Sequence, residues 1–253
     1  MKIAIVGYGK MGHIIEEVAR ERGHRIVCTF DGRPEESFDS PEFRSADVAI
    51  EFSQPSVAVD NILGAFAAGV PVVSGTTGWT DSLPEIREMC RKGRGTLLYA
   101  SNFSIGVNIF MAMNRWLASV MDDFPQYDPE MQETHHIHKL DHPSGTAITL
   151  ARELVARVER ITSWQEPAPG SDIDRRRTLE VSHVREGEVP GIHTVRWESE
   201  SDSITITHSA KTRRGFALGA VMAAEWLKGR KGYFTMGEFL SDLTKTTGLF
   251  TTD

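Results

Sequence analysis

The chain has 253 residues, which is enough for one large domain or two modest ones. Its 40% hydrophobic and 25% charged residues are ordinary for a soluble globular protein, and its apolar runs are too short to cross a bilayer. The net charge of −7 argues against nucleic acid as a partner. Two cysteines, Cys28 and Cys90, suit a reducing cytoplasm better than a disulfide framework. We therefore expect a cytoplasmic protein that binds neither membranes nor nucleic acid.

Strand and helix patterns alternate along residues 1–103. Short apolar runs predict strands at residues 2–6, 24–30, 47–53, 70–78 and 96–104. Amphipathic segments between them predict helices at residues 13–23, 54–69 and 81–93. Repeated strand–helix units of this length imply an α/β fold with a Rossmann-like, doubly wound parallel sheet.

The pattern changes after Phe103. Residues 104–124 predict one long helix leading into a second domain, followed by a strand at 129–139 and a helix at 144–161. Residues 164–177 are rich in Pro, Gly, Asp and Arg and predict a loop. Alternating segments at 177–186, 192–201 and 203–210 predict an open, mixed or largely antiparallel sheet with one covered face. With helices at 215–229 and 235–243, the second half of the chain adds an α+β domain.

The stretch "GYGKMG" at residues 7–12 has the spaced glycines of a dinucleotide-binding loop. Gly7 would make the tight turn after the strand, Gly9 would let the backbone approach a pyrophosphate, and Gly12 would let helix and strand pack closely. The N-terminus of the following helix favours phosphates. Asp31 ends the next strand, where a carboxylate would accept from the ribose 2′-hydroxyl and disfavour a 2′-phosphate. These features predict NADH as the cofactor.

Two features near this loop leave alternatives open. Arg33 could pair with a 2′-phosphate, or it could be a surface arginine, so NADPH remains an alternative cofactor. The stretch "SGTTGW" at 74–79 follows a predicted strand, at the edge where doubly wound sheets bind ligands. Backbone groups of Gly75, Thr76 and Thr77 could contact a nicotinamide, or the segment could be a simple β-turn.

The stretch "THHIHKLDHPSGTA" at 134–147 concentrates histidines with a lysine and an aspartate, which raises the question of a metal. Zinc sites need three or four convergent ligands. On a strand, His136 and His138 would share one face while His135 points to the other, and His142 would have to fold back. Neither cysteine lies nearby. We therefore expect no metal.

Proton transfer fits this stretch better. Histidine titrates near neutrality, and Lys139 lies four residues from His135, where it could supply a proton. Ser144, Gly145 and Thr146 begin a predicted helix, whose N–H groups and threonine hydroxyl could hold a carboxylate. A histidine-rich surface loop before a capped helix is the alternative.

The run "EMQETHHIHKLDHPSGTA" at 130–147 closely resembles the signature of the dihydrodipicolinate reductase family. The stretches "GYGKMG", "GTTGW", "SNFSIGVN" and "ITHSAKTRRGFALGAV" occur in the family's order, so the resemblance covers nearly the whole chain. It implies an NAD(P)H-dependent oxidoreductase that reduces 4-hydroxy-tetrahydrodipicolinate (dihydrodipicolinate) to tetrahydrodipicolinate in diaminopimelate and lysine biosynthesis. The substrate would be a small dicarboxylate.

The resemblance also implies roles for single residues. His135 matches the family's catalytic proton donor and acceptor, and Lys139 its proton donor. His136, Gly145 and Thr146 match its substrate-binding residues. From their positions alone, Ser144 at the same helix start and Arg213 near the hinge would join them, although Arg213 could also belong to a basic loop between strand and helix. The cofactor-binding residues would be Gly7, Tyr8, Gly9, Lys10, Met11, Gly12, Asp31, Gly75, Thr76, Thr77, Ala100, Ser101, Asn102 and Phe103.

The resemblance further implies how the chain is divided and assembled. Residues 1–106 and 215–253 would form the dinucleotide-binding domain, and residues 107–214 the substrate-binding and oligomerisation domain. The family is usually a homotetramer assembled through the open sheet, and residues 100–106 would act as a hinge. His138 and His142 receive no role. The alternatives to this function are a dinucleotide sensor without turnover, a metal-dependent hydrolase or lyase, and another oxidoreductase such as an amino-acid dehydrogenase.

Overall fold

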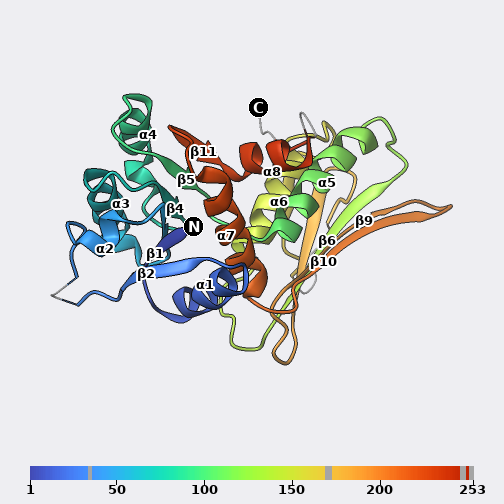
Figure 1. The fold of residues 1–253 in the computed structure, drawn as a ribbon. Coiled ribbons are helices and arrows are strands. Elements are labelled where there is room, and N and C mark those ends of the chain that lie inside the picture. Colours follow the sequence, from blue (N-terminus) through green and yellow to red (C-terminus); the bar gives the residue numbers. More distant parts are fainter. Residues whose placement is uncertain (34–35, 169–172, 246–248, 251–253) are drawn as a thin grey trace. The chain divides into compact units, whose positions relative to one another are not determined.

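The computed structural model describes residues 1–33, 36–168, 173–245 and 249–250 (Figure 1). The chain forms two compact units, one from Met1–Asn108 with Arg213–Asp253 and the other from Ile109–Thr212. The first unit is thus assembled from both ends of the chain, and the second is a continuous insertion within it. Among the described residues, no helix is both long and apolar enough to cross a membrane.

The first unit holds a six-stranded sheet in the order β11-β5-β4-β3-β1-β2, in which every neighbouring pair is parallel. Its strands are β1 (Lys2–Val6), β2 (Arg25–Phe30), β3 (Val48–Glu51), β4 (Val72–Ser74), β5 (Leu97–Tyr99) and β11 (Tyr233–Thr235). The strand order reverses at β1, because β2 lies on one side of it and β3 on the other. Doubly wound sheets bind ligands at the carboxyl ends of the strands beside such a switch point.

Helices bury both faces of this sheet. α1 (Lys10–Glu21) turns one stripe inward, formed by Gly12, Ile15, Val18 and Ala19. α7 (Arg214–Leu227), from the far end of the chain, packs against α1 (Figure 1). There Glu225 accepts hydrogen bonds from Arg22 at 2.8 Å. The other helices are α2 (Pro41–Arg44), α3 (Pro55–Ala67), the 3₁₀ turn Thr80–Ser82, α4 (Leu83–Arg91) and α8 (Met236–Thr244).

Two short elements of the first unit are absent from the sequence prediction. α2 is a single turn, capped by Ser40 Oγ, which accepts from the Phe43 N–H at 3.2 Å. β11 pairs in parallel with β5, with Tyr233 opposite Leu97. A three-residue edge strand has no periodic pattern of its own, so only its pairing with β5 defines it.

The second unit holds a five-stranded sheet in the order β10-β9-β6-β8-β7. Its strands are β6 (Asp128–His135), β7 (Ser163–Gln165), β8 (Thr178–Arg185), β9 (Ile192–Glu198) and β10 (Ser203–Ser209). β6 pairs antiparallel with β9 but parallel with β8, and β7 is parallel to β8. The sheet is therefore mixed, which confirms the first of the two arrangements that the sequence predicts. The helix α6 (Gly145–Val155) lies on the connection from β6 to β8, which permits that parallel pair.

Two details of this unit correct the sequence prediction. β6 ends at His135, and residues 136–139 form a turn in which the Lys139 N–H donates to the His136 carbonyl at 3.1 Å. His136 and His138 therefore do not share a strand face. The predicted loop at 164–177 also contains the end of β7, whose three residues extend the sheet edge beside β8.

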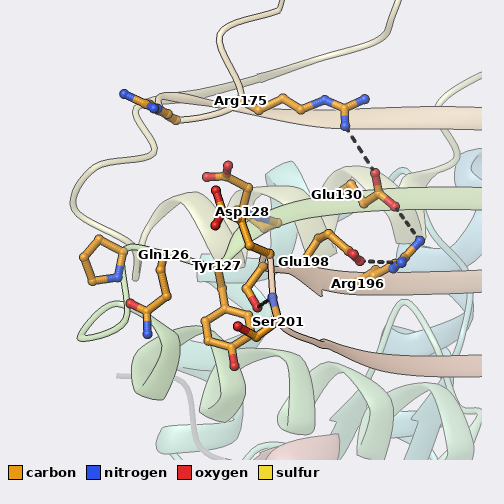
Figure 2. A pocket seen from close by; sticks show the side chains of 13 residues that line it. Gln126, Tyr127, Asp128, Glu130, Arg175, Arg196, Glu198 and Ser201 are labelled. Carbon is orange, nitrogen blue, oxygen red and sulfur yellow. Dashed lines mark hydrogen bonds and ion pairs between the residues drawn. The ribbon is translucent and has the colours of Figure 1, made fainter.

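One face of the mixed sheet is covered by α6 and by α5 (Ile105–Met121), which begins in the first unit. Trp197, Val195 and Val181 pack there against Leu150 and Leu154 of α6. The other face is polar. Figure 2 shows one end of it, a cavity of ≈ 830 Å³ where charged side chains of both signs pair. These include Glu130, Arg175 and Arg196.

Candidate functional site

The glycine turn after β1 has the geometry that the sequence predicts. Gly7 has a φ of 92°, and a Cβ there would overlap the Phe52 carbonyl. A Cβ on Gly12 would lie 2.5 Å from the Gly7 carbonyl oxygen, so the helix could not approach the turn. Gly9 instead faces open space, with no atom within 4 Å of an added Cβ. Two glycines thus allow close packing, and the third leaves the backbone accessible to a ligand.

A cavity of ≈ 550 Å³ adjoins this turn at the carboxyl ends of β1, β2 and β3. Its wall includes Gly7, Tyr8, Gly9 and Asp31. The Asp31 carboxylate is exposed and makes no hydrogen bond or ion pair with the described residues, so it is free to accept from a ribose. The Tyr8 hydroxyl donates to Glu16. An accessible backbone, a free carboxylate and a cavity of this size fit a dinucleotide.

Gly75, Thr76 and Thr77 line a second cavity of ≈ 200 Å³, together with Met11 of α1. The Thr76 hydroxyl is not free, because it donates to the buried carboxylate of Glu51 at 2.8 Å. Lys10 is exposed at the first position of α1. In this segment only backbone groups and Thr77 remain available to a ligand.

Glu51 is a residue that the sequence prediction missed. It ends β3 and is 1% exposed, and its oxygens also accept from the Ser74 hydroxyl at 2.6 Å and from Ser53. A buried carboxylate needs such donors. Glu51 therefore ties the ends of β3 and β4 together beneath the glycine turn.

The segment after β5 contains the last predicted cofactor residues. The Ala100 N–H donates to the Ser74 carbonyl at 3.2 Å, and the Asn102 side-chain oxygen accepts from the Ser104 N–H at 2.8 Å. Phe103 is buried, with its ring 5.7 Å from that of Phe52. Ser101 is exposed. The segment is thus fixed at the same carboxyl edge of the sheet as β4.

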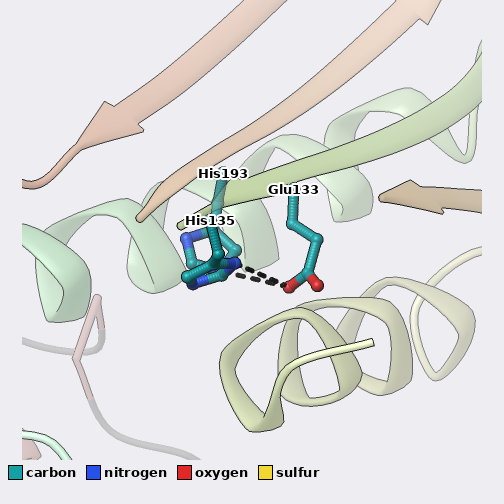
Figure 3. Close-up of side chains that lie close together, drawn as sticks. All are labelled: Glu133, His135 and His193. Carbon is teal, nitrogen blue, oxygen red and sulfur yellow. Dashed lines mark ion pairs between the residues drawn. The ribbon is translucent and has the colours of Figure 1, made fainter. Parts of the chain in front are cut away.

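The second unit buries an acid–base cluster where β6 and β9 run side by side (Figure 3). Glu133 lies directly opposite His193 in the strand register, and His135 follows two residues later on the same face. His135 Nδ1 is 3.5 Å and His193 Nε2 is 3.8 Å from Glu133 Oε2. All three side chains are buried. The alternation of β6 thus carries the two residues onto the covered face.

Further groups complete the surroundings of Glu133. Its Oε2 accepts from the Ser144 N–H at 3.0 Å, and its Oε1 lies 3.3 Å from Arg185 Nη2. The Ser144 hydroxyl lies 3.2 Å from His193 Nε2 and accepts from the Ala147 N–H as the α6 N-cap. Ser144 is 4% exposed, and its hydroxyl has a structural role as the cap of α6.

These surroundings set the protonation states. Burial lowers the pKa of His135; Glu133 opposes this, but Lys139 and Arg185 add to the lowering. Burial lowers the pKa of His193 to about 4. Burial alone would raise the pKa of Glu133, but hydrogen bonds from Ser144 and the two nearby imidazoles keep it below its ordinary value. At neutral pH the cluster holds a carboxylate between two neutral imidazoles.

The same three residues have ligand atoms within 4.8 Å of one another, the spacing of a metal site. Both carboxylate oxygens, however, already have partners in Arg185 and Ser144. The Arg185 guanidinium would also repel a cation at this point. The arrangement fits a carboxylate held by Ser144 and Arg185 and placed 3.5 Å from His135 Nδ1 better than it fits a metal centre.

Lys139 follows His135 by four residues and forms an ion pair with Asp141. Its Nζ is 2.9 Å and 2.8 Å from the two carboxylate oxygens of Asp141, and the lysine side chain is 21% exposed. Nδ1 of His136 is buried and has no hydrogen-bond partner among the described residues. A charged donor and an unpaired imidazole nitrogen thus lie within one turn of chain.

Gly145 and Thr146, which the sequence predicts to hold a carboxylate, are the first two residues of α6. Gly145 is exposed, and an added Cβ would meet no atom within 4 Å. The N–H groups of Gly145 and Thr146 have no acceptor among the described residues. Free N–H groups at a helix N-terminus attract carboxylates.

His138 and His142 form no hydrogen bond or ion pair with the Glu133–His135–His193 cluster among the described residues, and Arg213 lies outside the second unit. His138 pairs with Glu188 at 2.9 Å, and His142 stacks on His183 with both rings bonded to Glu166 at 2.8–3.1 Å. His142 therefore does not fold back toward His136. Arg213 is exposed at the start of α7 in the first unit.

Sequence reasoning included Glu133 in the family signature without giving it a role, and it missed His193 and the neighbouring Arg185. Glu133 carried a signal, because it precedes His135 by two positions on a predicted strand. Arg185 and His193 lie on strands remote in sequence, and only the pairing of β6 with β8 and β9 brings them together.

A doubly wound sheet with a glycine turn at its switch point, together with a unit bearing a buried acid–base cluster, defines a dinucleotide-dependent oxidoreductase. Comparison with family models matches the N-terminal region of dihydrodipicolinate reductase at residues 1–103 and its C-terminal region at residues 106–240. The chain belongs to the dihydrodipicolinate reductase family.

Individual relatives agree with this. A 4-hydroxy-tetrahydrodipicolinate reductase of Christiangramia forsetii is 47% identical over 97% of this chain and 100% of its own length. One from Archaeoglobus fulgidus is 34% identical over 95% of this chain and 100% of its own. The solved dipicolinate-bound dihydrodipicolinate reductase from Paenisporosarcina sp. TG-14 shares the fold, with a TM-score of 0.72, 20% identity and coverage of 93% and 97% of the two chains.

Proposed function

We infer the protein's reaction from its family and propose how its residues carry the reaction out. The protein is an NAD(P)H-dependent oxidoreductase that reduces 4-hydroxy-tetrahydrodipicolinate in the biosynthesis of diaminopimelate and lysine. The observation that carries the catalytic proposal is the buried Glu133–His135–His193 cluster, which adjoins Lys139 in the chain. This cluster lies in the part of the chain that matches the family's C-terminal model.

The first unit would hold the cofactor. The backbone at Gly7, Gly9 and the start of α1 would bind the pyrophosphate, and Asp31 the adenosine ribose. The nicotinamide end would contact backbone groups of Gly75–Thr77 and of residues 100–103. When bound, the reduced nicotinamide supplies a hydride. The free carboxylate of Asp31 favours the 2′-hydroxyl of NADH over the 2′-phosphate of NADPH, so we propose NADH as the preferred cofactor.

The second unit would hold the dicarboxylate. One substrate carboxylate would accept from the N–H groups of Gly145 and Thr146 at the α6 N-terminus. His136 would contact the substrate through its imidazole ring, and Arg213 would neutralise a carboxylate. Ser144 would contribute through the helix cap rather than by direct contact.

Lys139 and His135 would manage the proton. Hydride addition leaves an extra electron pair on the substrate, and the Lys139 ammonium, oriented by Asp141, would neutralise it with a proton. His135 is neutral at neutral pH, so it could accept or relay that proton, and Glu133 would stabilise the resulting imidazolium. With the hydroxylated substrate, His135 would take a proton from the carbon next to the hydroxyl-bearing carbon and return it to the hydroxide that leaves, so that water is lost and Lys139 keeps its proton for the step after hydride addition.

We also propose that the first unit binds the cofactor and the second the substrate, and that the protein is a cytoplasmic homotetramer. The polar, uncovered face of the mixed sheet supports assembly through the second unit, because a sheet face without covering helices is available to a second copy. The expected interface would pair the open faces of copies of this chain.

The experiment that tests the reaction follows loss of the reduced nicotinamide's ultraviolet absorbance. The substrate is generated from pyruvate and aspartate semialdehyde by the preceding synthase, and NADH and NADPH are assayed in parallel with and without a chelator. We expect rapid oxidation that the chelator does not affect. Cofactor binding without turnover would indicate a dinucleotide sensor, and inhibition by the chelator would indicate metal dependence.

A further inference from the structure

We propose that the backbone N–H groups of residues 31–33 form an anion site, which we call the nest, and that the Glu36 carboxylate occupies it in the free protein. Glu36 would thereby set the ratio of the affinities for NADH and NADPH. This inference rests on the cofactor binding proposed above, because it concerns the wall of the same cavity. It goes further than the free Asp31 carboxylate, since it assigns a specificity role to a residue with no signal in the sequence.

The geometry of this loop is that of an anion nest. The Asp31 N–H lies 2.7 Å and 2.9 Å from the two carboxylate oxygens of Glu36, and the Gly32 N–H lies 2.8 Å and the Arg33 N–H 3.1 Å from Oε2. Gly32 has a φ of 82°, a left-handed conformation that lets successive N–H groups converge. The Glu36 N–H also donates to the Arg33 carbonyl at 3.1 Å, so Glu36 is bonded to this backbone through both its side chain and its main chain.

The nest opens on the dinucleotide cavity. Gly32, Arg33 and Glu36 line the same ≈ 550 Å³ space as Gly7 and Gly9. In this fold class the pyrophosphate lies at the glycine turn and the adenosine ribose at the end of β2. The nest therefore lies at the ribose end of the cavity, where the two cofactors differ by one phosphate.

The charges at this point favour NADH. A 2′-phosphate monoester carries roughly −1.5 to −2 at neutral pH, and it would meet the carboxylates of both Asp31 and Glu36. It would also compete with Glu36 for the same N–H groups. The opposing group is Arg33, whose guanidinium makes no ion pair with the described residues. NADPH therefore binds well only if Glu36 leaves the nest, whereas NADH binds with Glu36 in place.

The test measures dissociation constants of NADH and NADPH by calorimetric titration without substrate. Wild type is compared with Glu36→Ala, which empties the nest, and with Glu36→Gln, which fills it without charge. Glu42→Gln is the control, because Glu42 is an exposed acid at the start of α2, and its charge, like that of Glu36, raises the pKa of Cys28. The nucleotides 2′-AMP and 5′-AMP serve as further probes of the phosphate position.

We expect wild type to bind NADH at least tenfold more tightly than NADPH. Glu36→Ala should tighten NADPH and 2′-AMP about tenfold, roughly 1.4 kcal/mol, while NADH and 5′-AMP change by less than about threefold. Glu36→Gln should give a smaller gain of the same sign, and Glu42→Gln should leave the NADPH/NADH ratio unchanged. An unchanged ratio in both Glu36 variants, or an equal shift in Glu42→Gln, would overturn the role of Glu36. If wild type bound neither dinucleotide, the proposed function itself would fail.

Discussion

Glu133 lies on β6 opposite His193, and its carboxylate is fully buried between groups that bind or release protons. It contacts His135, Arg185 and the Ser144 N–H at once. One side chain thus orients the candidate base and also fixes the helix whose N-terminus would hold the substrate. Loss of Glu133 would leave the partly buried Arg185 guanidinium without its carboxylate partner and would also free the Ser144 N–H.

The proton roles of His135 and Lys139 give the first prediction. His135→Ala and Lys139→Ala should each lower kcat by roughly 10²- to 10⁴-fold, the contribution of a positioned acid or base. NADH dissociation constants should stay unchanged, because both residues lie in the second unit. Steady-state kinetics with parallel NADH titrations would measure this, and His138→Ala, an exposed histidine paired with Glu188, is the matched control. Near-normal turnover in both variants would contradict the proposal that His135 and Lys139 transfer the proton.

Gly191 gives a second prediction. It has a φ of 154°, and a Cβ there would lie 3.0 Å from His135 Nε2. Gly191→Ala should displace the imidazole and lower kcat by roughly 10- to 100-fold, since small misplacements of catalytic groups are costly.

A double-variant cycle separates this effect from a general loss of fold. If Gly191→Ala acts through His135, it should reduce activity little further in the His135→Ala background. Additive losses in the double variant would show that Gly191 acts by another route.

Among the elements, α7 joins the first unit through a contact that requires glycine. A Cβ on Gly219 would overlap the carbonyl of Phe103, at the end of the proposed cofactor segment. Gly215, on the same helix, is nearly free, with the nearest atom 3.9 Å away at Ser104 Oγ. Substituting alanine at Gly219 and at Gly215 therefore compares a crowded with an open position on the same helix.

We predict that Gly219→Ala lowers the free energy of unfolding by about 1–3 kcal/mol, the usual cost of overpacking. It should also weaken NADH binding, because Phe103 must shift. Gly215→Ala should be neutral or slightly stabilising, owing to the higher helix propensity of alanine. Denaturant unfolding and NADH titration measure both effects, and equal behaviour of the two variants would contradict the close α7 contact.

At the scale of the whole molecule, stability should depend on pH through His193. Its pKa is about 4 in the folded protein against 6.5 as the ordinary value. Between these values the unfolded chain binds more protons, so the free energy of unfolding falls as pH drops from 6.5 to 4 and is fully retained above 6.5. The loss should reach up to about 3 kcal/mol. His135, whose pKa is also lowered, acts in the same direction.

Urea unfolding at a series of pH values from neutral to mildly acidic tests this dependence. His193→Asn should be less stable at neutral pH but should lose less stability as the pH falls. A pH slope identical to that of wild type would show that His193 is not the titrating group.

Assembly is the other prediction at this scale. Sedimentation should give four times the chain mass of 28.1 kDa. Thr207→Glu should shift the protein toward smaller species, because Thr207 is exposed on β10 and bonded to Thr194 across the uncovered face. Ser119→Glu, exposed on α5 away from the sheet, should leave the mass unchanged. A monomer in wild type would contradict assembly.

The sequence by itself determined the features that depend on local pattern. The glycine spacing predicted the turn at Gly7 and the tight contact at Gly12, because these constraints arise within one strand–turn–helix unit. The alternation of strands and helices predicted the parallel sheet, and the signature at 130–147 indicated the family. These signals are contained in neighbouring residues, so no tertiary information was needed.

Only the tertiary structure decided what distant strands bring together. The pairing of β6 with β8 and β9 placed Arg185 and His193 around Glu133, and it decided between the mixed and the largely antiparallel sheet that the sequence left open. The pairing of β11 with β5 added a sixth strand that has no pattern of its own. The physical reason is that a strand's register, and the burial of a polar side chain among its partners, are set by contacts across the sheet and not by the strand's own residues.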